Sequence, residues 1–439
     1  MLSIDNYFNF LYFAQSIYLM GNSKSKDYSK DTFFNTTQLK LLSGHFNLLF
    51  TKGTIDHSLT QKLFEVANDP EIHPSIENYL SSKVKGKKDF EGFLKALEIL
   101  IFGKNKTGGI SYDVKGPVER FSNLLNISED TQNFNEILLQ HLLAIIQGDF
   151  SIIASVNPHS KSIRDFQAYI QVQFPVLANC FPNFLISRLL DKPPSLPPTL
   201  NENTHSINEA LSFLYLSCPA LCGIELLRLY LSKEDGLSFN RLAAGLNGYQ
   251  GPMILTIKLS DSILLGAFIG DGLRDNAKYS GSMDTFLFTF YNGYRTFRPE
   301  EGEGGGNFIY FNSRIAGTTK FPKGLGFGGN VPQPARVWLD DDIDMNSYAI
   351  SHCSTYPPGD LFSGAETDGK MHIVSIEVWG CGGEKAAQAQ QEYRDSEAQR
   401  IQKNRQVDKA QFLDNQFDKD MLLGGTFKNA EYREKAEAE

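Results

Sequence analysis

The chain has few residues whose type and spacing predict catalysis or metal binding. Its cysteines are the first example. Its 439 residues include five cysteines, Cys180, Cys218, Cys222, Cys353 and Cys381. An odd, widely spaced set predicts free thiols in a reducing compartment and not a disulfide framework. Cys218 and Cys222 form a C-x-x-x-C pair, but no second pair of Cys or His follows at the spacing of a zinc site. We interpret the two as buried helical thiols.

A glycine-rich segment matches a nucleotide-binding motif in its letters alone. Residues Gly324–Gly329 read G-x-G-x-x-G. That motif binds pyrophosphate where a strand leads directly into the amino terminus of a helix. Pro332 and Pro334 follow too closely for a regular helix to begin. We therefore predict a packed loop, whose glycines allow positive φ and close backbone approach.

Two groups of carboxylates are further candidates, one for cation binding and one for acid–base chemistry. Asp340–Asp342 with Asp344 would offer oxygen ligands to a cation, but a solvated acidic strand end is the interpretation we favour. Glu377 lies in an alternating strand, and a carboxylate buried there needs partners. We predict a structural ion pair with Arg314 or Arg336, and no acid–base role.

No arrangement for nucleophilic catalysis is visible. His352 and Cys353 are adjacent, and neighbours in a strand point to opposite faces, so they cannot easily form a dyad. A calcium loop needs alternating oxygen ligands, and Lys104–Gly109 carries the wrong charge. A net charge of −9 without a long basic run argues against nucleic acid as the main partner. The sequence predicts no enzyme, cofactor or metal site.

The amino-terminal region contains a possible lipid-attachment motif. Met20 begins the sequence MGNSKSK, which matches the N-myristoylation pattern M-G-x-x-x-[ST], with Lys24 and Lys26 as a basic second signal. The acceptor would be Gly21, which requires translation to begin at Met20 and makes residues 1–19 a gene-model extension. The alternative is a chance internal hexapeptide. Residues 1–20 have neither the charge pattern of a signal peptide nor the composition of a membrane span.

A first set of elements is helical. Apolar residues at three- and four-residue spacing predict helices at Thr37–Phe50, Ser58–Ala67, Asp89–Ile101 and Phe134–Ile146. Asp89 and Asn133 are suited to begin the last two. Helix pairs with short loops fit a degenerate EF-hand-like scaffold that binds no calcium. The prolines of Asp191–Pro198 then indicate an extended linker.

The chain next changes from helices to strands. We predict helices at Ile207–Leu216 and Ile224–Leu231, then strands at Met253–Leu259, Ile263–Phe268, Thr285–Tyr291, Tyr294–Phe297, Asn307–Asn312, Arg336–Leu339 and His372–Trp379. Asn292-Gly293 is a strong hairpin signal. Many short strands with glycine-rich turns predict a β-sandwich flanked by a few helices.

The last segment is predicted to be a long helix. Glu384–Leu423 contains neither Gly nor Pro and is rich in Ala, Gln, Glu, Lys and Arg. At 1.5 Å per residue such a helix approaches about 60 Å. It is polar nearly all round, so it should project or dock on a partner through its apolar end, at Phe412, Leu413, Phe417 and Leu422. The alternative is a frayed tail.

Seven segments, in this order, resemble the TLDc domain family. They are Leu237–Leu242, Leu265–Phe268, Thr285–Phe288, Gly324–Gly329, Arg336–Asp340, Cys353–Tyr356 and Ile376–Gly380. The resemblance identifies Gly326, Gly328, Gly329, Trp338, Asp340, Glu377, Trp379 and Gly380 as structural signature residues. Within the family the chain resembles the mTOR-associated, eak-7-like branch, whose members also start MGNS.

The resemblance implies an α+β chain with a degenerate EF-hand-like helical region, a β-sandwich TLDc domain and a long carboxy-terminal helix. We expect an extension at 1–30, a helical domain at 31–190, a linker at 191–204, the TLDc domain at 205–383 and the helix and tail at 384–439.

The function that the resemblance implies is non-enzymatic regulation. The chain is expected to be a myristoylated, monomeric cytoplasmic lipoprotein, peripheral on the lysosomal or vacuolar membrane. There it would bind peripheral subunits of the vacuolar-type proton ATPase, with links to oxidative-stress resistance or TOR growth signalling. The alternatives are a membrane-tethered signalling adaptor that does not act on the pump, and an antioxidant enzyme.

Overall fold

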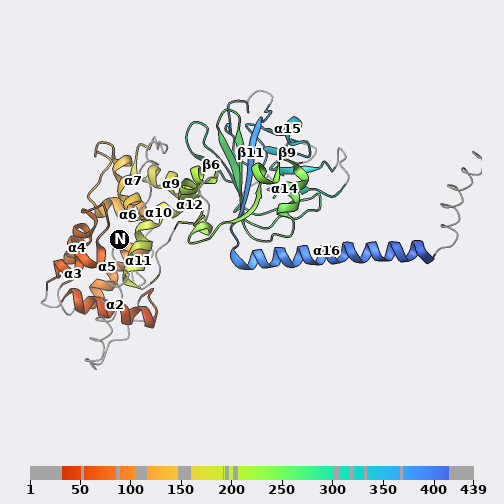
Figure 1. Cartoon of the computed structure of the whole chain (residues 1–439). Coiled ribbons are helices and arrows are strands. Elements are labelled where there is room, and N and C mark those ends of the chain that lie inside the picture. The colour runs from red at the N-terminus through yellow and green to blue at the C-terminus, as the bar shows by residue number, and fades with distance from the viewer. Residues whose placement is uncertain are drawn as a thin grey trace, which may run out of the picture.

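The chain folds into a helical half, a sandwich half and one long helix. The computed structural model describes residues 32–50, 54–85, 89–104, 116–146, 160–190, 192, 197–200, 206–299, 306–315, 321–330, 334–365 and 369–414. We call residues 36–189 the helical half and residues 207–380 the sandwich half (Figure 1). The predicted α+β class is confirmed.

The helical half is a bundle of short helices around one apolar core. The described helices are α2 (Thr36–Leu49), α3 (His57–Phe64), α4 (Ile72–Lys83), α5 (Phe90–Phe102), α6 (Pro117–Leu124), α7 (Phe134–Ile145), α9 (Ile163–Gln173), α10 (Pro175–Ala178) and α11 (Cys180–Leu189). Leu97, Phe121 and Leu142 are fully buried in its core. The four predicted helices are therefore present, and the degenerate EF-hand likeness stays a prediction.

Side chains at the helix ends explain where helices begin. The Asp89 carboxylate accepts a hydrogen bond of 2.9 Å from Gly92 N, so it caps α5 as predicted. Asn133 does not cap α7, because it takes a left-handed conformation with φ of 57° and its side chain makes no capping bond. Helix α3 ends at Phe64, before the predicted Ala67, because the chain turns between Val66 and Asp69.

The sandwich half consists of two antiparallel sheets. The first has the strand order β1-β11-β2-β3-β5-β6 and the second β10-β9-β8-β7-β4. The strands are β1 (Leu227–Leu231), β2 (Met253–Leu259), β3 (Leu264–Ile269), β4 (Tyr279–Ser280), β5 (Phe286–Thr289), β6 (Arg295–Phe297), β7 (Ile309–Asn312), β8 (Gly324–Phe327), β9 (Val337–Asp340), β10 (Tyr348–Ala349) and β11 (Ile373–Gly380). The flanking helices are α12 (Ile207–Ser217), η1 (Pro219–Leu221), α13 (Ser232–Asp235), α14 (Phe239–Leu246) and α15 (Ile343–Asn346).

Both faces of the six-stranded sheet are buried at its central strands. Leu255 and Ile257 of β2 point into the core between the sheets, together with Leu339 of the second sheet. Ile254 of β2 and Trp379 of β11 point the other way, into the core shared with the helical half. A strand buried on both faces loses the simple alternation of polar and apolar residues, so β2 reads as a continuous apolar run.

Two predicted elements differ from the structure. Ile224–Leu231 was predicted as a helix, but Leu227–Leu231 is strand β1, which pairs with β11 through Leu227 opposite Gly380 and Leu231 opposite Glu377. The apolar spacing fits either structure over so short a segment, and pairing with a long strand decides it. Gly324–Gly329 was predicted as a loop, but its first four residues are strand β8. Only Gly328 and Gly329, with φ of 70° and 77°, form the turn that follows.

The two halves are joined by a polar and aromatic contact. The Gln173 side-chain oxygen at the end of α9 accepts hydrogen bonds from Thr296 N and Oγ1 at 3.0 and 2.8 Å. Arg298 donates to Val172 O at 3.0 Å, and the Phe174 ring stacks on the Tyr294 ring with centroids 5.7 Å apart. Because these contacts combine hydrogen bonds with ring packing, they hold β6 against α9.

Candidate partner-binding surface

The long helix α16 (Gly383–Asp414) begins directly after β11. Tyr249 holds this junction, because its ring lies where a side chain on Gly380 would be, with Tyr249 Cζ only 2.6 Å from such a Cβ. The Tyr249 hydroxyl also accepts a hydrogen bond of 2.7 Å from Gly382 N. Ala386 packs against Gly251, where a larger residue would push the helix away. The direction of α16 is therefore fixed at its first turn.

Two polar side chains then tie α16 to the carboxy terminus of α14. Gln390 is buried, and its Nε2 donates to Gly245 O at 2.7 Å and to Asn247 O at 3.2 Å. Arg394 Nη2 donates to Gly245 O at 3.3 Å. The last carbonyls of a helix have no partner within it and carry partial negative charge, so an amide and a guanidinium suit them. We call Ala386, Gln390, Tyr393 and Arg394 the anchor of α16.

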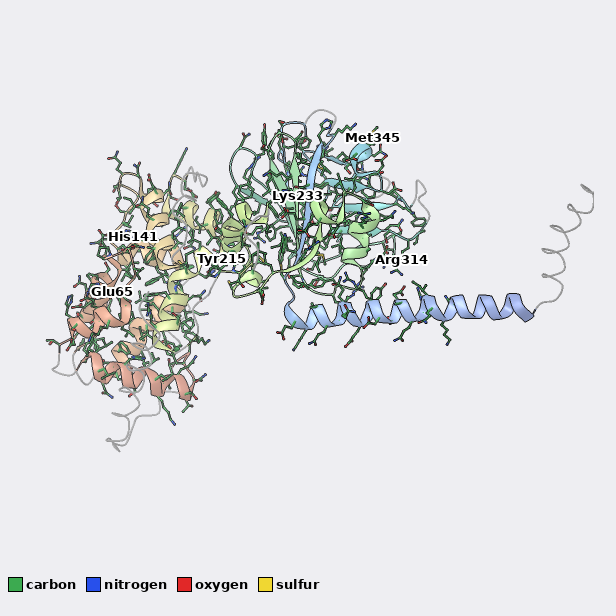
Figure 2. The ribbon with its side chains drawn as sticks, viewed as in Figure 1. Glu65, His141, Tyr215, Lys233, Arg314 and Met345 are labelled. Atoms are coloured by element: carbon green, nitrogen blue, oxygen red, sulfur yellow. The ribbon has the colours of Figure 1, made fainter. Side chains whose placement is uncertain are left out.

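Tyr393 completes the anchor on the next face of the helix. Its ring covers Gly248, a residue with φ of 83°, and occupies the space that a Cβ there would need. Arg314 donates a hydrogen bond to the Tyr393 hydroxyl, and Arg314 Nε lies 3.1 Å from the Asp275 carboxylate. Figure 2 shows Arg314 on the side of the sandwich half that faces α16.

Beyond the anchor, α16 leaves the sandwich half. Every residue from Ala398 to Asn404 is exposed, including Ile401 at 48 %. Figure 1 shows the helix running past the edge of the sandwich half. Phe412 and Leu413 lie in the last turn of α16, although their side chains are outside the description, and Phe417 and Leu422 lie outside the described residues altogether. The predicted long helix is present up to Asp414.

The family signature residues of the second sheet pack around Trp338. A Cβ on Gly326 would lie 2.7 Å from Trp338 Cε3, so the indole covers the bare backbone of β8. Trp338 Nε1 donates to the Asp340 carboxylate at 2.9 Å, and Asp342 N donates to the same carboxyl group at 3.1 Å. The Asp340 carboxylate is therefore already hydrogen-bonded within the protein. Burial and the adjacent Asp340 raise the pKa of Asp341.

The other signature glycines form the turn after β8. A Cβ on Gly328 would lie 2.8 Å from Cys353 Sγ, and a Cβ on Gly329 would overlap Pro334 O. Cys353 Sγ in turn accepts hydrogen bonds from Thr355 N at 3.4 Å and Tyr356 N at 3.3 Å. The Cys353 thiol thus stabilises the loop that contains it. His352 and Cys353 belong to this loop, so the strand geometry used to argue against a dyad does not apply to them.

Glu377 has different partners from those predicted. It is 3 % exposed, and its carboxylate accepts hydrogen bonds from Ser206 N at 2.9 Å and Ile207 N at 3.2 Å. These N–H groups begin α12, where the helix dipole is positive. Trp379 Nε1 lies 3.4 Å from the same carboxylate. Glu377 thus pairs with a helix end and not with an arginine.

The two arginines predicted for Glu377 are engaged elsewhere. Arg314 pairs with Asp275 and Tyr393. Arg336 is fully buried, donates to Gly359 O, and lies over the Phe297 ring at 5.3 Å. Burial lowers the pKa of Arg336 to about 10.

The three buried thiols are poorly suited to act as nucleophiles. Burial raises the pKa of Cys180 and of Cys381, and it raises the pKa of Cys218 to about 11. A thiol reacts as the thiolate, and burial disfavours that form. Cys218 and Cys222 flank the 3₁₀ turn η1 and do not lie on a regular helix, and Cys222 is half-buried, which corrects the prediction of buried helical thiols.

Two antiparallel sheets with this order of signature segments define the class of domain. Residues 202–382 match the model of the TLDc domain, so the chain contains a TLDc domain, as the resemblance predicted. Among the residues described, no helix is both long enough and apolar enough to cross a membrane.

Several curated proteins are similar to this chain. It is 27 % identical over 163 residues to MTOR-associated protein MEAK7 of Xenopus laevis, which covers 35 % of this chain and 31 % of the relative. It is 26 % identical over 162 residues to Oxidation resistance protein 1 of Xenopus tropicalis, covering 37 % and 16 %. With Nuclear receptor coactivator 7 of Gallus gallus it shares 27 % over 150 residues, covering 34 % and 15 %. The matched region spans less than a third of each relative.

Proposed function

We propose that this chain is a non-enzymatic regulator that binds peripheral subunits of the vacuolar-type proton ATPase. The TLDc domain is the docking platform, and α16 bridges to a second surface of the assembly. The names of the relatives describe mTOR association, oxidation resistance and nuclear receptor coactivation. All three descriptions are compatible with a binding role.

One observation carries the proposal: α16 is fixed at its base and exposed beyond it. Its anchor rests on hydrogen bonds from the buried Gln390 amide. From Ala398 to Asn404 each residue of the helix is exposed. A polar helix of this length gains little stability from its own domain. A binding partner that contacts the projecting part of α16 stabilises its helical conformation.

The proposal places the chain on the cytoplasmic face of a lysosomal or vacuolar membrane as a monomer. Gly21, the proposed myristoylation site, and the basic Lys24 and Lys26 lie outside the described residues. One acyl chain binds membranes weakly and reversibly, so the pump and the lipid would act together. Gly21→Ala should release the chain from membranes, and mass spectrometry of the native amino terminus will show whether Gly21 is the first residue and acylated.

The buried thiols favour a binding role over an antioxidant enzyme. Cys180, Cys218 and Cys381 are buried with raised pKa, and Cys353 serves as a hydrogen-bond acceptor in its loop. Peroxide turnover by the purified chain that is abolished by Cys353→Ser or Cys381→Ser would support the enzyme instead.

The decisive experiment is recovery of pump subunits from detergent-solubilised organelle membranes. Three tagged chains are compared: the full chain, one that ends at Glu397, and one that ends at Gly382. The chain ending at Glu397 keeps the whole anchor, so its sandwich half should unfold at the same temperature as the full chain. We expect it to recover far fewer peripheral subunits than the full chain.

The controls distinguish the competing functions. The chain ending at Gly382 removes the anchor as well, so it reports what loss of packing adds to loss of the projecting helix. Equal recovery by the full chain and the chain ending at Glu397 would contradict a bridging role for α16. If the full chain recovers signalling proteins but no pump subunits, the membrane-tethered adaptor is the better description.

A further inference from the structure

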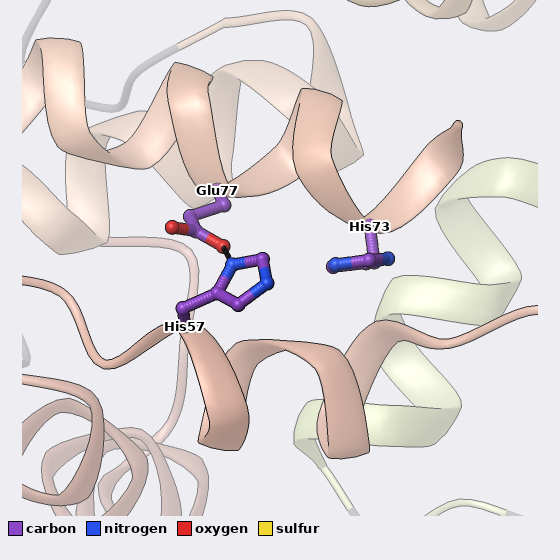
Figure 3. A group of neighbouring side chains, drawn as sticks. All are labelled: His57, His73 and Glu77. Atoms are coloured by element: carbon purple, nitrogen blue, oxygen red, sulfur yellow. Dashed lines mark hydrogen bonds and ion pairs between the residues drawn. The ribbon is translucent and has the colours of Figure 1, made fainter. Parts of the chain in front are cut away.

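Two histidines and a glutamate converge between helices α3 and α4 of the helical half. His57 is the first residue of α3, and His73 and Glu77 stand four residues apart on α4. Residues four apart share one face of a helix. One nitrogen from each histidine and one carboxylate oxygen all lie within 4.8 Å of one another. Figure 3 shows the three side chains meeting in the space between the two helices.

The contacts within this group leave one nitrogen unused. His57 Nδ1 lies 2.6 Å from Glu77 Oε2, and the centroids of the two imidazole rings are 5.4 Å apart. His73 Nε2 is enclosed and has no hydrogen-bond partner among the residues described. A buried polar atom normally has a partner, so this nitrogen calls for a ligand.

We propose that His57, His73 and Glu77 bind a divalent transition-metal ion, and that the ion is Zn²⁺. Two imidazole nitrogens and one carboxylate oxygen are the protein ligands of one well-known kind of zinc site, in which water takes the fourth position. Mg²⁺ and Ca²⁺ prefer a shell made of oxygen atoms alone, which this group does not provide. The ion replaces the direct contact between His57 Nδ1 and Glu77 Oε2.

The side chains can reach the required geometry with small movements. Zinc bonds of about 2.0–2.1 Å in a tetrahedron place the ligand atoms about 3.3 Å apart. The contact between His57 Nδ1 and Glu77 Oε2 must therefore lengthen by about 0.7 Å from its 2.6 Å, while His73 moves inward. His57 is 67 % exposed, so its ring turns without disturbing the core.

The charges near the site also favour a cation. Both histidines lie in the first turn of a helix, where the dipole alone repels positive charge. Asp56 is the N-cap of α3 and Glu71 that of α4. The Asp56 carboxylate accepts a hydrogen bond of 3.1 Å from Leu59 N and so offsets the end of α3, and the Glu77 carboxylate neutralises part of the charge of the ion.

This site could not be recognised from the sequence. His57 and His73 are separated by a turn and most of a helix, so no short motif contains both. The candidate metal sites visible in the sequence were the cysteine pair, the acidic strand end and the calcium-loop-like segment. None of them includes these three residues. Only the packing of α3 against α4 brings the three ligands together. A bound ion would cross-link the two helices.

The test is zinc titration of the full chain by calorimetry. We expect one equivalent to bind. Its affinity should fall by at least about 10–100-fold in His57→Ala, His73→Gln and Glu77→Gln, because each removes a direct ligand and loss of even a second-shell partner costs that much. His352→Ala is the matched control, since His352 is exposed and distant in sequence, and it should bind zinc unchanged. Zinc should raise the unfolding temperature of the unaltered chain, and Mg²⁺ should not.

Two results would overturn the proposal. The first is unchanged zinc affinity in His57→Ala, a variant whose exposed position makes misfolding an unsuitable explanation. The second is a thiolate-to-metal charge-transfer band when Co²⁺ replaces zinc, which would place the ion on the cysteines. Circular dichroism of each variant without metal confirms that it is folded, and if His73→Gln misfolds, His57→Ala decides alone.

Discussion

Replacing Glu377 should destabilise the sandwich half strongly. Glu377→Ala leaves Ser206 N and Ile207 N without the acceptor that they now share. Each buried donor left without a partner costs about 1–3 kcal/mol. The lost attraction between a carboxylate and a helix amino terminus adds about 0.5–1 kcal/mol. These terms add to about 2.5–7 kcal/mol, and we expect a loss near the middle of that range, about 3–5 kcal/mol.

Glu377→Gln distinguishes the contribution of the negative charge to stability from the contribution of the hydrogen bonds. The amide keeps one acceptor oxygen but presents a donor to the second N–H group, so the expected loss is about 1–3 kcal/mol. If Glu377 instead formed an ion pair with a buried arginine, both variants would leave an uncompensated charge and cost similar amounts. The order of the two variants therefore reports on the nature of the partner.

Urea unfolding followed by tryptophan fluorescence measures these losses. The chain has two tryptophans, and Trp338 and Trp379 both lie in the sandwich half. With an m-value of about 3 kcal/mol/M, a loss of about 3–5 kcal/mol lowers the midpoint by about 1–1.7 M. Glu384→Ala, on the exposed first turn of α16, is the control and should leave the midpoint in place. A shift below about 0.2 M in Glu377→Ala would refute the reasoning.

Three further predictions concern packing, the anchor and alkaline pH. Gly326→Ala should lower the urea midpoint by an amount equivalent to about 1–3 kcal/mol, because its Cβ would lie 2.7 Å from the Trp338 ring. Gln390→Ala should speed amide hydrogen exchange in the first turns of α16 while β2 and β3 keep their protection. Because burial raises the pKa of Cys218 from 9.0 to about 11, its contribution to stability is complete below pH 9 and is lost as the pH rises to 11. The unfolding temperature of Cys218→Ala should therefore fall less steeply over that range than that of the unaltered chain.

Much of the fold was predictable because local signals agreed with the tertiary structure. Met253–Leu259 was predicted as a strand and is β2. The Asn292-Gly293 hairpin joins β5 to β6, with both residues at positive φ. Strand β1 was missed because its apolar spacing fits a helix equally well, and only pairing with β11 decides the matter.

The partners of individual side chains were less predictable. Strand alternation indicated that Glu377 would need partners if it were buried, but its partner is a backbone helix end 170 residues away in sequence, which no side-chain pattern records. The anchor of α16 depends on the free carbonyls of Gly245 and Asn247 in the same way. Hydrogen bonds to backbone leave no residue type to recognise, so sequence reasoning assigns such partners to side chains.

The geometry of α16 makes it a cantilever. It is clamped between Gly380 and Arg394, and 17 residues follow Glu397 up to Asp414, which is about 26 Å of helix beyond the anchor. A rocking of about 10° at the clamp displaces the tip by about 4–5 Å, roughly one helical turn. Small changes around Tyr249 and Gln390 are therefore magnified at the far end, where a shift of one turn exchanges one set of contacts for another.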